Sequence, residues 1–278
     1  MIDRRSRTQR FFEIELPAAI LIVIALAPYA WMAITSIKPT ADIARFPVVY
    51  WPDEPTLIHY ADLLARTTFP KNLLDSFIVA VSACALGLGL SVPAAYAFSR
   101  FGFFGRRFLM TQFLTINMFP IVLMIIPLFV AMRSLGLLDT VPGVVLGHAT
   151  FAIPFAIWML TSYLNGIPKE LDEAAMVDGA SRVQTIVKIL LPLAAPGIVS
   201  TGIYIFVASW NEYLFAMMLS GQNVRTVTVA LQMFIGEYTI QWGLLTAGGT
   251  LVALPVTLLF LFVQRHLIGG LTAGAVKS

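Results

Sequence analysis

Charged residues and cysteine are scarce in this chain of 278 residues. Only 12% of the residues are charged, and Cys84 is the single cysteine. One cysteine can form neither a disulfide within the chain nor a metal cluster by itself, so the sequence argues against redox chemistry. The three histidines, His59, His148 and His266, lie in separate regions without the spacing of a zinc site, and we interpret each as a satisfied or solvated side chain. No cofactor is therefore expected to bind to this chain.

The chain is instead rich in long apolar runs. Hydrophobic residues make up 58% of it, and the mean hydropathy of +0.83 lies outside the usual range of soluble globular domains. Crossing a bilayer takes roughly 20 residues in a helix. We therefore predict an all-α fold, a polytopic membrane bundle of six transmembrane helices forming a single domain over residues 1–278. The predicted spans are Leu16–Ile37, Ser76–Phe98, Phe108–Met132, Val141–Leu164, Leu193–Leu219 and Leu244–Val263.

The distribution of lysine and arginine predicts the orientation of these spans. The side that holds both termini and the segment 165–192 carries more of these residues than the other side, so the positive-inside rule places both termini in the cytoplasm. Juxtamembrane charge also explains the net charge of +3 without a nucleic-acid partner, with membrane lipid as the expected surroundings. Ala25–Ala27 resembles the cleavage site of a secretion signal, but the apolar run continues past it, which favours a span.

The segment 165–192 contains a short acidic helix. Pro168 suits a first helical position, and the acidic residues that follow it lie near the positive end of the helix dipole. Gly179 is a typical helix stop. Leu171, Ala174 and Ala175 share a face at i, i+3 and i+4, and the small alanine side chains would let another surface approach closely.

A second helix is predicted to follow directly. Ser181 and Gln184 have the spacing of a capping box, and the helix is expected to run to Pro192. The loop is thus a helical hairpin. From physical chemistry alone, it is equally well interpreted as a docking element or as an amphipathic hairpin on the membrane surface.

The motif of this hairpin resembles that of a known family. Glu173-Ala174-Ala175, then Gly179, then Ile189-Leu190-Leu191-Pro192 is similar to the EAA motif of the membrane subunits of ATP-binding-cassette importers. The stretches "SVPAAYAFSRFGFFGRR", "SWNEYLFA", "IGEYTIQWGLL" and "GLTAGAVKS" are similar to the smaller permease subunit of maltose-type sugar importers. The resemblance covers nearly the whole chain.

This resemblance implies a function and a set of partners. The chain would form half of the translocation pathway for a di- or oligosaccharide or a related glycoside, in a bacterial cytoplasmic (inner) membrane. Its partners would be a homologous permease subunit, a dimer of ATPase subunits that holds ATP and Mg, and an extracytoplasmic sugar-binding protein. Glu173 would pair with a basic residue of the ATPase. The end of the cytoplasmic tail 264–278, from Gly270 to Ser278, would reach toward the ATPase dimer interface. The residues expected to couple to the ATPase are Glu173, Ala174, Ala175, Asp178, Gly179 and Pro192.

ATP hydrolysis is expected on those separate subunits because this chain has no phosphate-binding loop. The pattern G-x-x-x-x-G-K-[ST] is absent, and Gly87 and Gly89 lie inside an apolar run with no strand before it. Ala83, Gly87 and Ser91, each four residues apart, instead predict a seam of small residues for helix packing. The chain is therefore not expected to be an enzyme.

Polar residues inside the spans are the candidates for the translocation pathway. Ionisable groups at membrane depth are costly and often functional, and Glu212 is the clearest of them. Asn211, Glu212 and Tyr213 are predicted to line the pathway, with Asn117 as a weaker candidate. In the alternative interpretation, Glu212 caps a neighbouring helix or reaches the headgroups, while Trp210 and Tyr213 anchor the membrane interface. Prolines within the spans either bend a moving bundle or make static kinks.

Two loops are predicted on the outer side. Residues 38–71 are proline-rich and are expected to form an irregular cap. Residues 221–242 are too polar to span; they would meet the binding protein by resemblance, or form a short helix at the membrane surface.

Two other classes of function predict patterns of their own. An ion-coupled carrier acting alone would predict two similar halves and several ionisable groups at mid-membrane. A membrane enzyme would need a cluster of titratable residues. Neither pattern is evident in the sequence.

Overall fold

The computed structural model describes residues 10–275, and the side chains of residues 10–263. Within this range the fold is helical, apart from an isolated bridge between Ile235 and Ile240. Five helices are long and apolar enough to cross a membrane, in agreement with five of the predicted spans. They cover Phe11–Ser36, Phe69–Arg100, Val141–Asn165, Arg182–Trp210 and Trp242–Val263.

The third apolar run is broken instead of continuous. Helix α6 (Arg106–Met118) ends before Pro120, and a 3-10 turn and α7 (Ile125–Ser134) leave it at an angle of 99°. Proline disfavours helical geometry in the residue before it, and Phe119 is accordingly extended, with φ −73° and ψ 135°. The third predicted span, Phe108–Met132, is therefore a bent pair of helices.

The fifth apolar run differs from the prediction at both ends. At its start, α10 (Arg182–Thr185), a π turn (Ile186–Leu190) and α11 (Leu191–Trp210) form one continuous helix, so no helix ends at Pro192. Pro192 has no backbone N–H, so it cannot donate the helical hydrogen bond to the turn before it. The backbone hydrogen bonds of that turn, Ile186–Leu190, have the π-helical spacing instead. At its far end the helix stops at Trp210, and a separate helix, α12 (Leu214–Leu219), follows.

The chain divides into two compact units. The first comprises residues 1–70 and 231–254, and the second comprises residues 71–230 and 255–278. The first contains α2 (Leu16–Ser36), α3 (Thr40–Ile43), α4 (Ile58–Arg66) and the beginning of α14 (Trp242–Ala275). Its segment 38–71, predicted to be irregular, thus includes the helix α4. His59 in α4 is satisfied as predicted, since its Nε2 donates to the Lys38 carbonyl oxygen at 2.9 Å.

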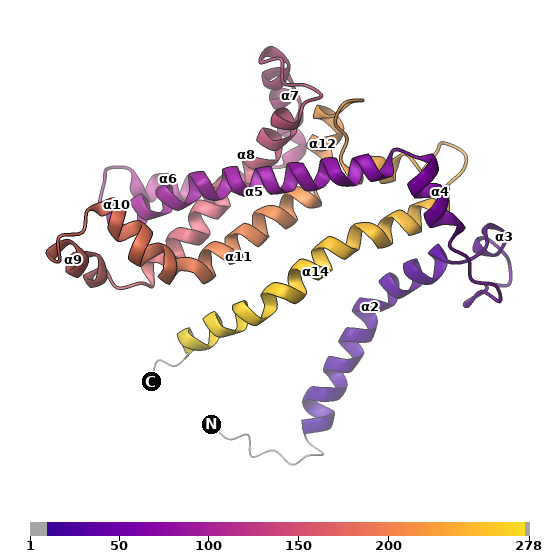
Figure 1. Ribbon diagram of the computed structural model, residues 1–278, viewed down its shortest axis with the longest axis horizontal. Coiled ribbons are helices and arrows are strands. Elements are labelled where there is room, and N and C mark those ends of the chain that lie inside the picture. Colours follow the sequence, from indigo (N-terminus) through magenta and orange to yellow (C-terminus); the bar gives the residue numbers. More distant parts are fainter. Residues whose placement is uncertain (1–9, 276–278) are drawn as a thin grey trace. The chain divides into compact units, whose positions relative to one another are not determined.

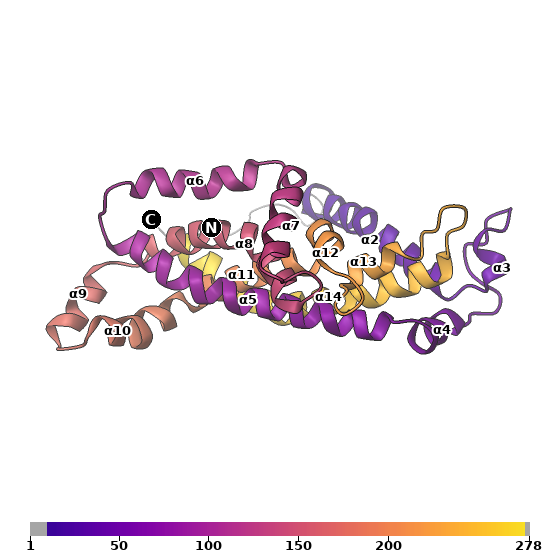
Figure 2. The same cartoon turned by 90° about the horizontal axis from the view of Figure 1, so that it is seen from above.

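The second unit contains most of α5 (Phe69–Arg100), then α8 (Val141–Asn165), α11 and α12, with α9 (Glu170–Val177) and α10 at one end (Figures 1 and 2). We call this the hairpin end. Helix α8 packs against α6, α11 and α12. Beyond α12, α13 (Val227–Gln232) is the short helix in the segment 221–242.

Small residues allow the helices of the second unit to approach closely. Ala83 and Ser91 are fully buried, and a Cβ on Gly87 would lie 2.8 Å from Cδ1 of Ile205 on α11. The predicted small-residue seam on α5 is therefore confirmed, with α11 against it. Near the hairpin end, a Cβ on Gly197 would lie 2.5 to 2.8 Å from ring atoms of Tyr163, so α11 and α8 are in close contact there.

Candidate functional site: an acidic hairpin and a polar cavity

The first arm of the hairpin has the predicted start and stop signals. Helix α9 carries three acidic residues in its first turn, where negative charge is favourable. At its other end Gly179 has φ +87°, which favours glycine. The Gly179 N–H donates to the Met176 carbonyl oxygen at 3.1 Å, and the Ala180 N–H donates to that of Ala175 at 3.0 Å. These bonds form a Schellman motif that terminates the helix at the predicted place.

The second arm begins with the predicted capping box. The Ser181 Oγ accepts a hydrogen bond from the Gln184 N–H at 3.3 Å, and the Gln184 Oε1 accepts one from the Ser181 N–H at 2.8 Å. From this cap the helix continues without interruption to Trp210. Pro192 is thus an exposed residue within a span, and the hairpin joins that span directly.

The face that α9 leaves open differs from the predicted one. Glu173, Ala174 and Asp178 are exposed, whereas Ala175 is only 5% exposed. Helix α9 packs on α10 and on the π turn, which accounts for the inward face. Leu171, Ala174 and Ala175 therefore do not form a single open stripe, and the free acidic surface centres on Glu173 and Ala174.

A buried ion pair holds α9 to the rest of the unit. Arg100, the last residue of α5, donates from Nε to Oδ2 of Asp172, and the two side chains are 6% and 8% exposed. The two lie 72 residues apart, and no local pattern connects them.

A hollow of about 120 Å³ lies beside this ion pair. Its lining is rich in charged side chains of both signs, together with aromatic rings and a methionine. It is lined by Tyr96, Arg100, Phe101, Lys169, Asp172, Glu173, Met176 and Arg182. Because Arg100 and Asp172 are buried and paired with each other, the exposed charges of the hollow are those of Lys169, Glu173 and Arg182. These charges suit a polar or charged side chain of a partner.

Glu212 occupies the gap between α11 and α12. Its carboxylate accepts hydrogen bonds from the N–H groups of Phe215 (3.0 Å) and Ala216 (2.8 Å), so it caps α12. Its Oε2 also lies 3.2 Å from Nε2 of His148 on α8, and Nδ1 of His148 lies 2.7 Å from Oγ of Ser209. The alternative role of helix cap is thus present. Nδ1 of His148 is hydrogen-bonded, whereas its buried Nε2 faces the Glu212 carboxylate without hydrogen-bond geometry, so His148 is only partly satisfied.

Glu212 and His148 also line a cavity of about 110 Å³. The remaining lining is mostly aromatic and aliphatic, and consists of Ile121, Phe151, Ala152, Tyr204, Ala208 and Phe215. Sequence reasoning missed His148 as a member of this group because 64 positions, including the whole hairpin, separate it from Glu212.

The other pathway candidates do not gather at this cavity. The side-chain amides of Asn211 and Asn117 donate to carbonyl oxygens of their own helices, Val207 and Phe113, each at 3.0 Å, and both residues are exposed. Tyr213 is half-buried. Trp210 is only 2% exposed, so it does not serve as the interface anchor considered above.

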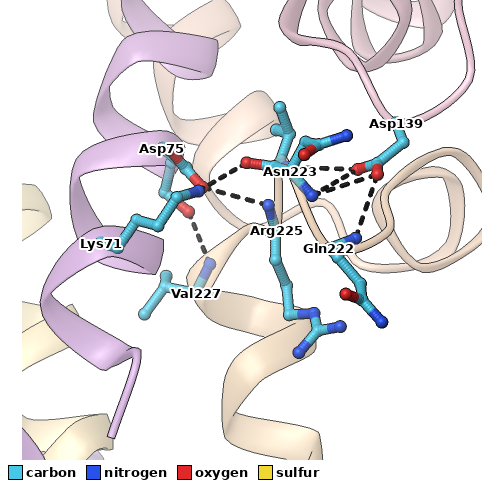
Figure 3. Close-up of polar contacts among 9 residues, drawn as sticks. Lys71, Asp75, Asp139, Gln222, Asn223, Arg225 and Val227 are labelled. Atoms are coloured by element: carbon cyan, nitrogen blue, oxygen red, sulfur yellow. Dashed lines mark hydrogen bonds and ion pairs between the residues drawn. The ribbon is translucent and has the colours of Figure 1, made fainter.

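The segment 221–227, which we call the outer loop, is anchored by acidic side chains (Figure 3). The Asp139 carboxylate accepts hydrogen bonds from the N–H groups of Gln222, Asn223 and Val224, at 3.0 to 3.1 Å. Burial by itself would raise the pKa of Asp139, but these backbone donors outweigh it and hold the pKa below its usual value.

A second anchor of the outer loop lies on α5 (Figure 3). Oδ2 of Asp75 accepts from Nζ of Lys71 at 2.7 Å and from the Arg225 N–H at 3.1 Å. Nζ of Lys71 also donates to the Asn223 carbonyl oxygen, and Oγ of Ser76 accepts from the Val227 N–H at 2.7 Å. The outer loop is therefore held from two elements by its own backbone groups.

A multi-span helical bundle with an exposed acidic hairpin that continues into a span is the architecture of a membrane permease subunit. A family model described as "Binding-protein-dependent transport system inner membrane component" matches residues 87–272. The chain belongs to this family. Membership confirms the resemblance and decides against an ion-coupled carrier acting alone. The family is a family of transport permeases, which is consistent with the expectation that the chain is not an enzyme.

Similar proteins of known identity include sugar permeases. The chain is 34% identical over 262 residues to the sulfoquinovosyl glycerol transport system permease protein SmoH of Agrobacterium fabrum, covering 94% of this chain and 92% of that protein. It is 35% identical to the trehalose/maltose transport system permease protein MalG of Thermococcus litoralis, covering 94% and 95%. A solved chain of a bacterial ABC transporter involved in the import of the acidic polysaccharide alginate has a TM-score of 0.80 at 26% identity, covering 94% and 98%. The chain is thus an ABC importer permease in sequence and in fold.

Proposed function

We propose that this chain is one of two membrane subunits of an ATP-driven carbohydrate importer, and that α9 docks on a separate ATPase subunit. The observation that carries the proposal is α9 itself. It is a short acidic helix with Glu173 and Ala174 exposed, linked at one end to α8 and at the other to a helix that continues into a span.

The surface chemistry of α9 supports a protein partner with a basic side chain. Glu173 is exposed at the rim of the charged hollow, and Ala174 beside it leaves room for close approach. Gly179 and the capping box fix the turn that presents this surface. ATP and Mg would be held by the ATPase subunits, with Asp178 and Pro192 at the edges of the contact.

The transported molecule is proposed to be a di- or oligosaccharide or a related glycoside. The two curated relatives described above are named for glycosides or disaccharides. The cavity of Glu212 combines a carboxylate, an imidazole and aromatic rings, a combination that can hydrogen-bond hydroxyl groups and cover apolar sugar faces. Asn211, Tyr213 and Asn117 would line other parts of the pathway, in a second conformation or against the partner permease.

The proposed orientation follows the positive-inside rule, with the hairpin and both termini in the cytoplasm and the outer loop facing a sugar-binding protein. Family membership supports the inner membrane as the location. Helix α14 continues to Ala275, but the side chains of the tail 264–278 lie outside the described residues, and its contact with the ATPase dimer stays a prediction.

Docking is tested by co-purifying the chain with its ATPase subunit from membranes. Glu173→Lys places two positive charges together at the contact, and we expect a loss of about 2 to 5 kcal/mol of binding free energy, or at least about 30-fold. Gly179→Asp is expected to act in the same direction because it strains the turn. Glu237→Lys makes the same charge reversal at an exposed position in the outer segment and should leave assembly unchanged.

If Glu173→Lys assembles as the wild type does, the hairpin is a membrane-surface element and the docking proposal fails. The pathway is tested separately, by ATP-driven sugar uptake in proteoliposomes with the binding protein added. Glu212→Gln and Asn211→Ala are expected to slow uptake at normal assembly. Unchanged uptake would remove these residues from the pathway.

A further inference from the structure

Arg100 joins three helices at the hairpin end. Its Nε donates to Oδ2 of Asp172 on α9, and its Nη1 donates to the Leu164 carbonyl oxygen in the last turn of α8 at 3.1 Å. Beside it, Oγ of Ser99 donates to Oδ1 of Asn165 at 2.9 Å. The end of α5 is thus bonded both to the end of α8 and to the start of α9.

Stability alone is a poor explanation for this ion pair. Arg100 and Asp172 are both more than nine-tenths buried, so both have lost most of their hydration. Nη2 of Arg100 and Oδ1 of Asp172 are buried with no hydrogen-bond partner among the described residues. A buried ion pair offsets its desolvation only when its remaining polar atoms are also satisfied. What the pair does supply is direction, because a guanidinium donates in a fixed plane.

Helix α9 needs such an orienting contact. It has only eight residues, too few to be stable as an isolated helix. The four residues Gly166–Lys169 connect it to α8, so by the chain alone it could pivot about this linker. The packing of α9 on α10 and the π turn, with Ala175 buried, holds one side of α9. Asp172 ties the other side to α5 through Arg100.

We propose that the Arg100–Asp172 pair is a rigid link that makes α9 move together with α5 and α8. A displacement that the ATPase imposes on α9 would then reach the two spans without being absorbed at the linker. This inference rests on the proposed docking of α9. Arg100 and Asp172 act as positioning residues, since they touch neither sugar nor nucleotide.

The test replaces both charges together. Arg100→Met with Asp172→Leu exchanges the pair for apolar side chains, which preserves burial but removes the directional bonds. The full complex is reconstituted with its binding protein, and three quantities are measured: the ATPase subunit recovered with the chain, ATP hydrolysis, and sugar molecules imported per ATP hydrolysed. The matched control is Asp62→Asn with Arg66→Gln on α4, which removes a pair with a 3.2 Å contact between an exposed arginine and a half-buried aspartate.

A loss of the link and a loss of stability give different results. A merely structural defect lowers the amount of complex, and uptake and hydrolysis fall in proportion. We expect near-normal assembly and hydrolysis in the double variant, with sugar imported per ATP reduced about fivefold or more. A ratio that stays within about twofold of the wild type, as expected for the control, would overturn the proposal.

Arg100→Lys provides a second route if the double variant is not recovered from membranes. Lysine keeps the charge beside Asp172 but lacks the planar fork that also reaches Leu164. We expect a lowered ratio at normal assembly, and an unchanged ratio would count against the link. The docking proposal fails independently, through unaltered assembly of Glu173→Lys.

Discussion

The two ends of the second unit use acidic residues in opposite ways. At the outer loop, Asp139 and Asp75 accept several backbone N–H groups, so the carboxylates fix the loop itself (Figure 3). At the hairpin end, Asp172 is buried against one arginine, while Glu173, the next residue, is exposed. The outer loop is thus held along its length by hydrogen bonds, whereas α9 is held by one buried ion pair and by its packing on α10 and the π turn, and it keeps a free face.

The difference between the outer loop and the hairpin end shows how one chain can present both a fixed and a moving surface. Many hydrogen bonds to backbone groups leave a segment little freedom, and each bond contributes a modest amount. A single buried ion pair transmits direction to a whole helix, but its loss is costly. Substitutions at the two ends should therefore differ in how much they change stability and in how many residues they affect.

The largest effect is expected from removing one partner of the ion pair. Arg100→Met leaves the Asp172 carboxylate buried and uncompensated, which should lower the free energy of unfolding by about 3 to 5 kcal/mol. Thermal unfolding of the purified chain in detergent, followed by intrinsic fluorescence, measures it. Adding Asp172→Leu should recover most of this loss. If the single variant were as stable as the wild type, the hairpin would not depend on this one contact.

A smaller effect is expected where α11 approaches α8 at the hairpin end. Gly197→Ala would push a methyl group to within 2.8 Å of the Tyr163 ring and should cost about 1 to 3 kcal/mol. Gly89→Ala is the matched control, because a Cβ there meets nothing within 4 Å. In a helix this alanine should be neutral or stabilise by about 0.5 to 1 kcal/mol. The same unfolding measurement applies. Equal stabilities of the two variants would show that α11 and α8 are not closely packed at Gly197.

The smallest and most local effect is expected at the outer loop. Asp139→Asn weakens the acceptor for the N–H groups of residues 222–224, so hydrogen exchange of these amides should speed up while global stability changes little. Exchange measured by mass spectrometry tests this, with α8 peptides as the internal reference. A uniform rise across the unit would contradict a local role.

The pH dependence of the outer loop has a definite sign. A carboxyl with a lowered folded-state pKa contributes stability above its unfolded value, and this is lost only as the pH falls through the folded value. For Asp139 that loss lies below pH 3.8, the ordinary value. Exchange protection of residues 222–224, corrected for the intrinsic rate, should therefore be the same at pH 7 and pH 5. A drop between these pH values would mean that Asp139 is not the anchor.

Structural features that depend on neighbouring residues could be predicted from the sequence alone. Apolar runs of sufficient length predict membrane spans, and Ser181, Gln184 and Gly179 set the ends of the two hairpin arms through local hydrogen bonds and backbone geometry. The EAA motif identified the family before any contact was known. A proline such as Pro120 favours a bend in a helix, but it does not determine the angle of 99° between the two parts of this span.

Which distant residues come into contact depends on the tertiary structure and could not be predicted from the sequence. Arg100 with Asp172, His148 with Glu212, and Asp139 with the outer loop are pairs separated by more than 60 positions. Helices such as α8 and α11 are apolar all round, so their sequences carry almost no amphipathic pattern to show which side faces a neighbour. Their rotation is set by close contacts such as Gly197 against Tyr163, which depend on how several helices pack at once.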